Sequence, residues 1–83
     1  MLKPTLRQLD ILEAVARCGN FSRASVELHL TQPAVSMQIK QLESTLGLPL
    51  FEQIGKQIQL TEAGREALRA SRTIGRELIN LEH

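Results

Sequence analysis

The sequence predicts a small, mainly α-helical fold in which four helices are joined by short connections and one β-hairpin precedes the last helix. Apolar residues recur at three- and four-residue steps in several segments, a period that is typical of amphipathic helices. One short segment, residues 52–60, instead has two short extended runs on either side of a glycine-containing turn, a pattern typical of a β-hairpin. With 83 residues, 42% of them hydrophobic, the chain is long enough for one small globular domain.

Charge and cysteine content narrow the class of protein. Ten basic and nine acidic side chains give a net charge of +1, so overall charge does not by itself indicate a nucleic-acid partner. The single cysteine, Cys18, cannot form a disulfide within the chain, and we interpret it as a small apolar residue in a reducing compartment. No segment approaches the ~20 apolar residues of a membrane span, and we expect no signal peptide. A cytoplasmic protein without a membrane partner is therefore predicted.

The first helix is predicted to begin after Thr5 and to end at Gly19-Asn20. Thr5 and Gln8 have the spacing of a capping box, in which each side chain binds the backbone of the other residue. Glycine just past the last periodic residue is a helix stop. The residues expected to be buried form one stripe: Leu6, Leu9, Leu12, Val15 and Ala16.

The second helix is predicted to be short, beginning with Ser22 as its N-cap and ending near His29. Phe21 and Val26 then have the spacing of a hydrophobic staple. A small-residue inner face, made of Ala24, Ser25 and Leu28, would let another helix approach closely. His29 stands where a turn often has glycine, so it requires a less common backbone geometry.

The third helix has two unlike faces. Thr31 is its predicted N-cap, Pro33 lies in the first turn, where a missing N–H costs nothing, and Gly47 ends it. At about 100° per residue, the buried stripe consists of Val35, Ile39, Leu42 and Leu46. The opposite face carries Pro33, Met37, Lys40 and Ser44, with Ser36 and Gln41 beside them.

The outer face of the third helix is the main candidate for function. No acidic residue occurs between Glu27 and Glu43, so this face can lie against phosphates and base edges. An ordinary solvated face fits the same pattern. The two short helices joined by a tight turn, the first with small residues inside, form a helix-turn-helix pattern, which favours the DNA-facing interpretation.

A β-hairpin is predicted after the third helix. Pro49 prevents a longer helix, and residues 52–54 and 58–60 are short extended runs around Gly55-Lys56-Gln57. A hairpin in this position is a wing, whose tip would bring Lys56 to a phosphate; a solvated lysine is the alternative. Phe51 is interpreted as a core residue, with base stacking as the less favoured role.

The last helix is predicted over residues 61–80, with Thr61 as its cap. Small and apolar residues recur at heptad spacing along this helix and form one seam: Leu60, Gly64, Ala67, Ser71, Ile74 and Leu78. This seam is too long to be covered by so small a domain, so we predict a dimer interface made of Ala67, Ser71, Ile74 and Leu78. A solvated helix with a frayed tip is the alternative. We therefore expect three parts: a winged helix-turn-helix domain over residues 1–60, a linker helix over residues 61–80 and a tag remnant over residues 81–83.

The constellations that enzymes need are not evident in the sequence. His29 and His83 are isolated, no Cys/His cluster has the spacing of a metal site, and no glycine-rich loop is placed to cradle a phosphate. Ser22, Ser25 and Ser36 have no convincing base and acid partners. We therefore predict no catalytic, cofactor-binding or metal-binding residues and do not expect an enzyme.

Several linked motifs occur in order along the chain: residues 31–36 (TQPAVS), Ile39, Leu42-Glu43, Leu46-Gly47, Leu50-Phe51 and residues 60–64 (LTEAG). Over residues 5–80, the sequence resembles the N-terminal DNA-binding domain of bacterial LysR-type transcriptional regulators. The resemblance implies a winged helix-turn-helix and a linker helix that pairs two subunits. Residues 29–43 most resemble the regulators of carbon-fixation (RuBisCO) operons.

The resemblance also implies a set of DNA contacts at the start of the third helix and on the wing. Carried over by position, these residues are Gln32, Pro33, Ala34, Ser36, Met37 and Lys40, and on the wing Gln53 and Lys56. Met37 and Gln53 stand where many relatives have arginine. Met37 therefore lacks a bidentate guanine contact and offers an apolar contact to a thymine methyl, whereas Gln53 lacks one charge for a phosphate.

Two functions from different classes follow. The leading hypothesis is sequence-specific binding of double-stranded DNA, an interrupted palindrome, by a homodimer in transcription regulation. The alternative is a winged-helix module that binds another protein, which the acid-free outer face disfavours. The family's effector-binding domain is absent from this chain, so a small-molecule effector would bind only in that missing domain.

Overall fold

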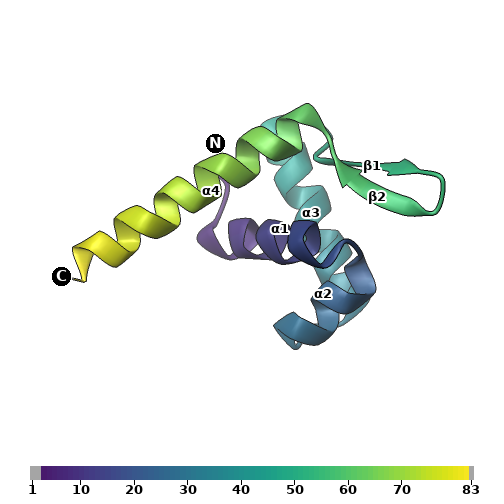
Figure 1. The fold of residues 1–83 in the computed structure, drawn as a ribbon, viewed down its shortest axis with the longest axis horizontal. Coiled ribbons are helices and arrows are strands. Elements are labelled where there is room, and N and C mark those ends of the chain that lie inside the picture. The colour runs from purple at the N-terminus through teal and green to yellow at the C-terminus, as the bar shows by residue number, and fades with distance from the viewer. Residues whose placement is uncertain (1–2, 83) are drawn as a thin grey trace.

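Figure 1 shows the computed structural model, which describes residues 3–82 and contains four helices and a two-stranded sheet within that range. The elements are α1 (Leu6–Cys18), α2 (Phe21–Leu28), α3 (Gln32–Leu46), β1 (Phe51–Ile54), β2 (Gln57–Leu60) and α4 (Glu62–Leu81). The predicted fold class, a winged helix-turn-helix with a long last helix, is confirmed. His83, the last residue of the expected tag remnant, lies outside the described residues.

The elements are arranged so that α1 lies between the other helices. It contacts α2, α3 and α4, while the hairpin and the far end of α4 extend in opposite directions (Figure 1). The Cα positions accordingly span 43 × 27 × 21 Å. The molecule therefore has a compact helical body with two projections, a wing at one end and half of a helix at the other.

Local caps fix the starts of three helices as predicted. The Thr5 hydroxyl accepts a hydrogen bond from the Gln8 amide at 3.0 Å, and the Gln8 side chain accepts one from the Thr5 amide at 3.1 Å. Thr31 and Thr61 accept hydrogen bonds from the amides three residues on, at 3.2 and 3.0 Å. Each cap satisfies a backbone N–H that has no partner inside its helix.

The predicted start of α2 is wrong by two residues. Asn20, not Ser22, is the N-cap, because its extended backbone (φ −161°) places its side-chain oxygen 2.6 Å from the Arg23 amide. The Phe21–Val26 staple is also wrong, since Val26 is 76% exposed. The expected unusual geometry at His29 is confirmed by its left-handed backbone (φ 57°) at the end of α2.

The core is formed where α1, α2, α3 and the start of β1 meet. Its largest fully buried side chains are Ile11, Leu12, Val15, Val35, Leu42 and Leu50. Two predictions of burial are wrong: Leu6 is 52% exposed and Leu46 is 41% exposed, because each lies in a terminal turn of its helix, at the edge of the body. The stripe predicted for α1 also missed Ile11 and Ala14, which are buried because three helices surround α1.

The start of α4 is held by backbone contacts to the segment that follows α3. The Thr61 amide donates to the Leu50 carbonyl at 3.0 Å, and the Thr61 hydroxyl donates to the Pro49 carbonyl at 2.6 Å. A Cβ atom added at Gly64 would lie 2.1 Å from the Leu50 carbonyl oxygen. Only glycine allows this approach, so it sets the direction in which α4 leaves the body.

The wing is an antiparallel hairpin that is one residue longer on each strand than predicted. Phe51 pairs with Leu60 and Ile54 with Gln57, and Gly55 adopts a positive φ of 63° in the turn. Phe51 is half-buried, and its ring meets that of Phe21 edge-on, with centroids 5.8 Å apart. This contact supports the interpretation of Phe51 as a core residue and attaches the wing to α2.

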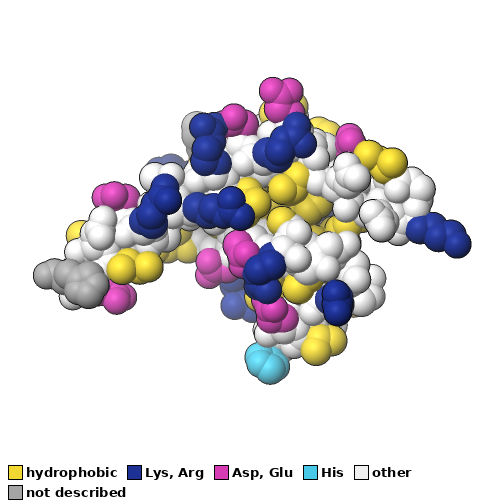
Figure 2. All heavy atoms as spheres, in the orientation of Figure 1, with side chains coloured by type: hydrophobic (Ala, Val, Ile, Leu, Met, Phe, Trp, Pro, Cys, Tyr) yellow, Lys and Arg dark blue, Asp and Glu magenta, His cyan; other side chains and the backbone are white. Residues whose placement is uncertain are grey.

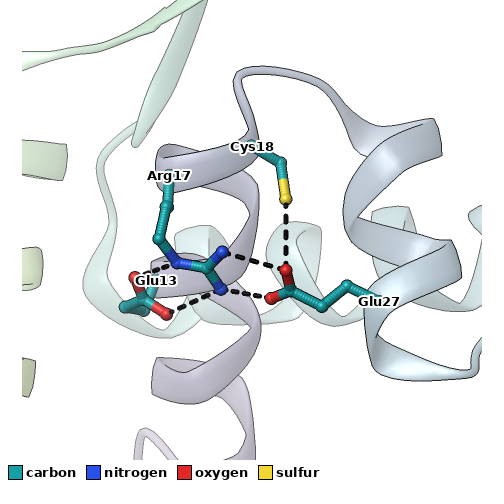
Figure 3. A network of polar contacts seen from close by, with 4 residues as sticks. All are labelled: Glu13, Arg17, Cys18 and Glu27. Carbon is teal, nitrogen blue, oxygen red and sulfur yellow. Dashed lines mark hydrogen bonds and ion pairs between the residues drawn. The ribbon is translucent and has the colours of Figure 1, made fainter.

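A charged network on the surface joins α1 to α2 (Figure 3). The Arg17 guanidinium lies between two carboxylates, donating to Glu13 at 3.0 Å and to Glu27 at 2.9 Å. The hydrogen bonds from Arg17 lower the pKa of Glu27, and those from Glu27 and Glu13 raise the pKa of Arg17. Because these side chains are exposed, the network contributes only weakly to stability.

Candidate nucleic-acid interface

The outward face of α3 forms one continuous surface. Val35, Ile39 and Leu42 are buried on the opposite side of the helix, as the sequence predicted. The outward face bounds a hollow lined by Pro33, Ser36, Met37, Lys40, Gln41 and Ser44. All six residues are uncharged or basic, so nothing in the lining repels a polyanion. We call these six residues the α3 outer surface.

A second depression, of about 300 Å³, lies between α3 and the wing. It is lined from α3 by Ser36, Ile39, Lys40 and Glu43, from the hairpin by Phe51, Glu52, Gln53 and Ile58, and from α2 by Phe21. Ser36 and Lys40 line both depressions, so the two lie next to each other along α3. The Glu43 carboxylate accepts a hydrogen bond from the Leu50 amide at 2.7 Å, which ties this acid to the loop after α3.

Two predicted contact residues lie at the start of α3, outside both depressions. Gln32 is exposed, and its side-chain oxygen accepts a hydrogen bond from the Ser22 hydroxyl at 3.0 Å. Ala34 is half-buried, and its amide donates to the Thr31 cap. The contribution of Ala34 to a contact is thus limited to a small apolar surface beside Gln32.

The two predicted wing residues lie in different places. Gln53 lines the depression with Ser36 and Lys40, and its amide nitrogen donates to the Gly55 carbonyl at 3.3 Å. Lys56 lies in the turn of the hairpin, and Figure 2 shows a single basic side chain at the tip of the wing. The wing therefore offers a lysine on a different element from Lys40 of α3.

Of the residues predicted for a dimer interface, Ala67 packs against the core of the body, and the other three follow it along the part of α4 that leaves the body. Ala67 and Ser71 are half-buried, whereas Ile74 and Leu78 are 37% and 42% exposed. Leu68, which the seam did not include, is the last buried residue of α4 in the described range. Figure 2 shows basic side chains along this helix, beside exposed apolar ones.

The sequence did not assign three residues of this region to the site. Gln41 and Ser44 line the hollow, and their place on the outer face follows from helical spacing alone. Ser22 touches Gln32 across the helix-turn-helix, ten residues away in the sequence. No local pattern predicts that contact, because it depends on how α2 packs on α3.

Within residues 3–82, no group of three or more His, Cys, Asp or Glu side chains is placed to hold a metal ion. In the same range, no helix has both the length and the apolar character needed to cross a bilayer.

Comparison with known proteins identifies the family. The family described as bacterial regulatory helix-turn-helix proteins, lysR family, matches residues 6–65. The RuBisCO operon transcriptional regulator of Allochromatium vinosum is 59% identical over 78 residues, which are 94% of this chain and 26% of that protein. The transcriptional activator CmpR of Synechocystis is 53% identical over 74 residues, which are 89% of this chain and 24% of that protein. The chain thus spans about a quarter of the length of these relatives.

Solved structures share the fold over nearly the whole chain. The CbnR_DBD–DNA complex superposes with a TM-score of 0.83 at 38% identity, covering 94% of this chain and 88% of that one. The BenM_DBD/catB site 1 DNA complex gives a TM-score of 0.86 at 27% identity, covering 93% and 86%. The resemblance to LysR-type regulators, and to those named for RuBisCO operons, is confirmed. This chain belongs to the lysR family of bacterial regulatory helix-turn-helix proteins.

Proposed function

We propose that this chain is the DNA-binding part of a transcription regulator, and that it binds double-stranded DNA sequence-specifically as a homodimer. The observation that carries the proposal is the α3 outer surface, which is free of acidic residues and lies next to the depression between α3 and the wing. An exposed α-helix of this kind fits the major groove of B-DNA, where base edges are distinguishable. Solved relatives bound to DNA favour this partner over the alternative, a protein.

The proposed contacts divide into two classes. Gln32, Ser36 and Met37 would touch base edges, with the Met37 thioether chain against a thymine methyl. Lys40 on α3 and Lys56 on the wing would bind phosphates, which position the protein without reading the sequence. The remaining proposed contacts are apolar or neutral: Pro33, Ala34 and Gln53.

We further propose that α4 pairs two copies of the chain. Ile74 and Leu78 are apolar, partly exposed and spaced four residues apart, beyond the last residue that the body buries. Pairing would cover them and would hold two α3 helices for two half-sites, about 34 Å or a multiple of that distance apart. An interrupted palindrome is the expected target, because its symmetry matches that of the dimer.

The test of pairing is the double substitution Ile74→Asp plus Leu78→Asp. It should give a monomer in sedimentation with weak affinity for a two-half-site duplex, because buried charges would oppose association. Thr73→Asp plus Asn80→Asp is a matched control that adds the same two charges at exposed positions of α4 outside the seam. A dimer that survives the first change would contradict the assignment of the interface.

The test of DNA recognition is a titration of the chain onto an interrupted-palindrome duplex and a scrambled control, each at low and high salt. We expect tight binding to the palindrome that survives moderate salt, and weak, salt-sensitive binding to the control. The log–log slope with salt should be near −0.9 per phosphate contact. Equal affinities for both duplexes would leave only a basic surface, and a salt-independent interaction would indicate a protein partner instead.

The wider role follows from the relatives. We infer that the whole protein regulates transcription of carbon-fixation operons, since the names of several relatives specify RuBisCO operons. Such a protein would act in the cytoplasm, where bacterial DNA lies. It would bind any small-molecule effector in a domain outside this chain, because the relatives are about four times as long. A transcription factor of this kind is not an enzyme.

A further inference from the structure

Ser22 and Gln32 form a side-chain contact between the first turns of α2 and α3. The Ser22 hydroxyl donates to the Gln32 side-chain oxygen at 3.0 Å, and both residues are exposed at the N-terminal ends of their helices. Ser22 is available for this bond because Asn20 caps α2 in its place. The bond therefore has no capping role and joins two turns that other contacts already fix.

The backbone around both residues is held firmly. The hydroxyl of Ser25, which is buried, donates to the Ser22 carbonyl at 2.6 Å, and the Leu30 amide donates to the Ser25 carbonyl at 2.9 Å. On the other side, the Thr31 cap fixes the turn in which Gln32 is the first helical residue. The hydroxyl thus sits on a rigid frame and restrains a side chain that would otherwise rotate freely.

We propose that Ser22 is a positioning residue that sets the specificity of Gln32. This inference rests on the DNA-binding function proposed above. A glutamine amide has an acceptor end and a donor end, and free rotation would let it present either one to a base. In the structure the Ser22 hydroxyl donates to the Gln32 oxygen, which leaves the Gln32 NH₂ group free to donate to a base.

The orientation predicts which bases Gln32 reads. An outward NH₂ group pairs with acceptors on the major-groove edge, such as guanine O6 and N7 or thymine O4, and not with the cytosine amino group. A glutamine without Ser22 could turn its oxygen outward and accept from cytosine or from the adenine amino group. The Ser22 hydroxyl therefore narrows the base preference at one position of each half-site.

The experiment selects binding sequences from a pool of duplexes with a randomised central region, using the chain and four variants. The variants are Ser22→Ala, Ser22→Thr, Gln32→Ala and the Ser22→Ala/Gln32→Ala double change. The readout is the enrichment ratio between bases at each position of the selected half-site. Thermal unfolding serves as a control, and should be unchanged because both side chains are exposed.

The expected result is local to one position. Ser22→Ala should lower the preference there by about three- to tenfold, the effect of losing one hydrogen bond, while other positions keep theirs. Ser22→Thr should retain the wild-type preference because it keeps the hydroxyl. In the Gln32→Ala background, Ser22→Ala should have no further effect, because the residue acts through Gln32 alone.

Other outcomes would overturn the inference. If Ser22→Ala weakened binding to all sequences equally, or if its effect added to that of Gln32→Ala, Ser22 would contact DNA itself and would not act through Gln32. These results would leave the proposed function intact. If the unsubstituted chain selected no common sequence, the proposed function would fail, and the positioning role would fail with it.

Discussion

The helices α3 and α4 are both amphipathic, but the body holds them in different ways. α3 buries Val35, Ile39 and Leu42 along most of its length, so its outward face is fixed relative to the core. α4 is held only near its start, where Gly64 and Leu68 are buried, and its later apolar residues are partly exposed. The surface proposed to read DNA is therefore fixed to the core, while the surface proposed to pair two chains is left uncovered by its own chain.

Among single substitutions that test this difference between α3 and α4, Leu42→Ala should lower the free energy of unfolding most. Leu42 is fully buried, and truncating it leaves a cavity, so we expect the free energy of unfolding to fall by about 3 kcal/mol. Leu78→Ala is the matched control in α4, and in the monomer it should cost less than about 0.5 kcal/mol, as exposed sites do. Urea unfolding at low protein concentration measures both. Equal losses would contradict the difference between the two helices.

The attachment of α4 should be sensitive to Gly64→Ala. A Cβ atom there would lie 2.1 Å from the Leu50 carbonyl oxygen and 2.8 Å from Leu60 Cδ2, so the backbone must shift. We expect a loss of about 2 kcal/mol in the free energy of unfolding. Gly75→Ala adds the same atom where nothing lies within 4 Å, and should stabilise the helix by about 0.5–1 kcal/mol. Thermal unfolding of the two variants should therefore shift in opposite directions.

Within α3, two changes on the outer surface should separate base reading from phosphate binding. Ser36→Ala should weaken binding to the preferred duplex by about 1–2 kcal/mol and relax base preference, whereas Lys40→Ala should weaken all duplexes evenly. The salt slope should fall by about one unit for Lys40→Ala only. Titrations at several salt concentrations measure these quantities, and unchanged unfolding of both variants confirms that α3 remains in place.

The smallest effect should come from the network that joins α1 to α2. Because Arg17 lowers the folded-state pKa of Glu27, this pair contributes stability above the ordinary Glu27 value of 4.5 and loses it as the pH falls through the lowered value. Glu27→Gln should therefore reduce the fall in melting temperature between neutral and acidic pH. Glu52→Gln on the wing is the matched control outside the network. If both variants kept the wild-type profile, the network would have no role in stability.

Features that depend on neighbouring residues were predictable from the sequence. The caps at Thr5, Thr31 and Thr61 were correct because each bonds to an amide three residues on. The same reasoning failed at Ser22, since α2 begins at Phe21 and Ser22 lies inside the helix, while Asn20 binds the Arg23 amide as the N-cap. Local patterns thus identified all four helices but did not decide between two possible capping residues that lie two positions apart.

Features that depend on packing were harder to predict. The outward face of α3 followed from helical period, because one side of that helix is buried along most of its length. The burial of Ile11 and the exposure of Leu46 could not be predicted from helical period, because they depend on how many helices surround each turn. The contact of Ser22 with Gln32 could likewise not be predicted from the sequence, since it joins residues from two helices.

The close approach at Gly64 has a consequence for how this chain can evolve. Every other amino acid carries a Cβ atom, so any missense change in this codon places an atom against the Leu50 carbonyl. No conservative step is available, and tolerance of a change requires a compensating shift in the segment after α3. Among related sequences, this position and the residues around Leu50 should therefore vary together or not at all.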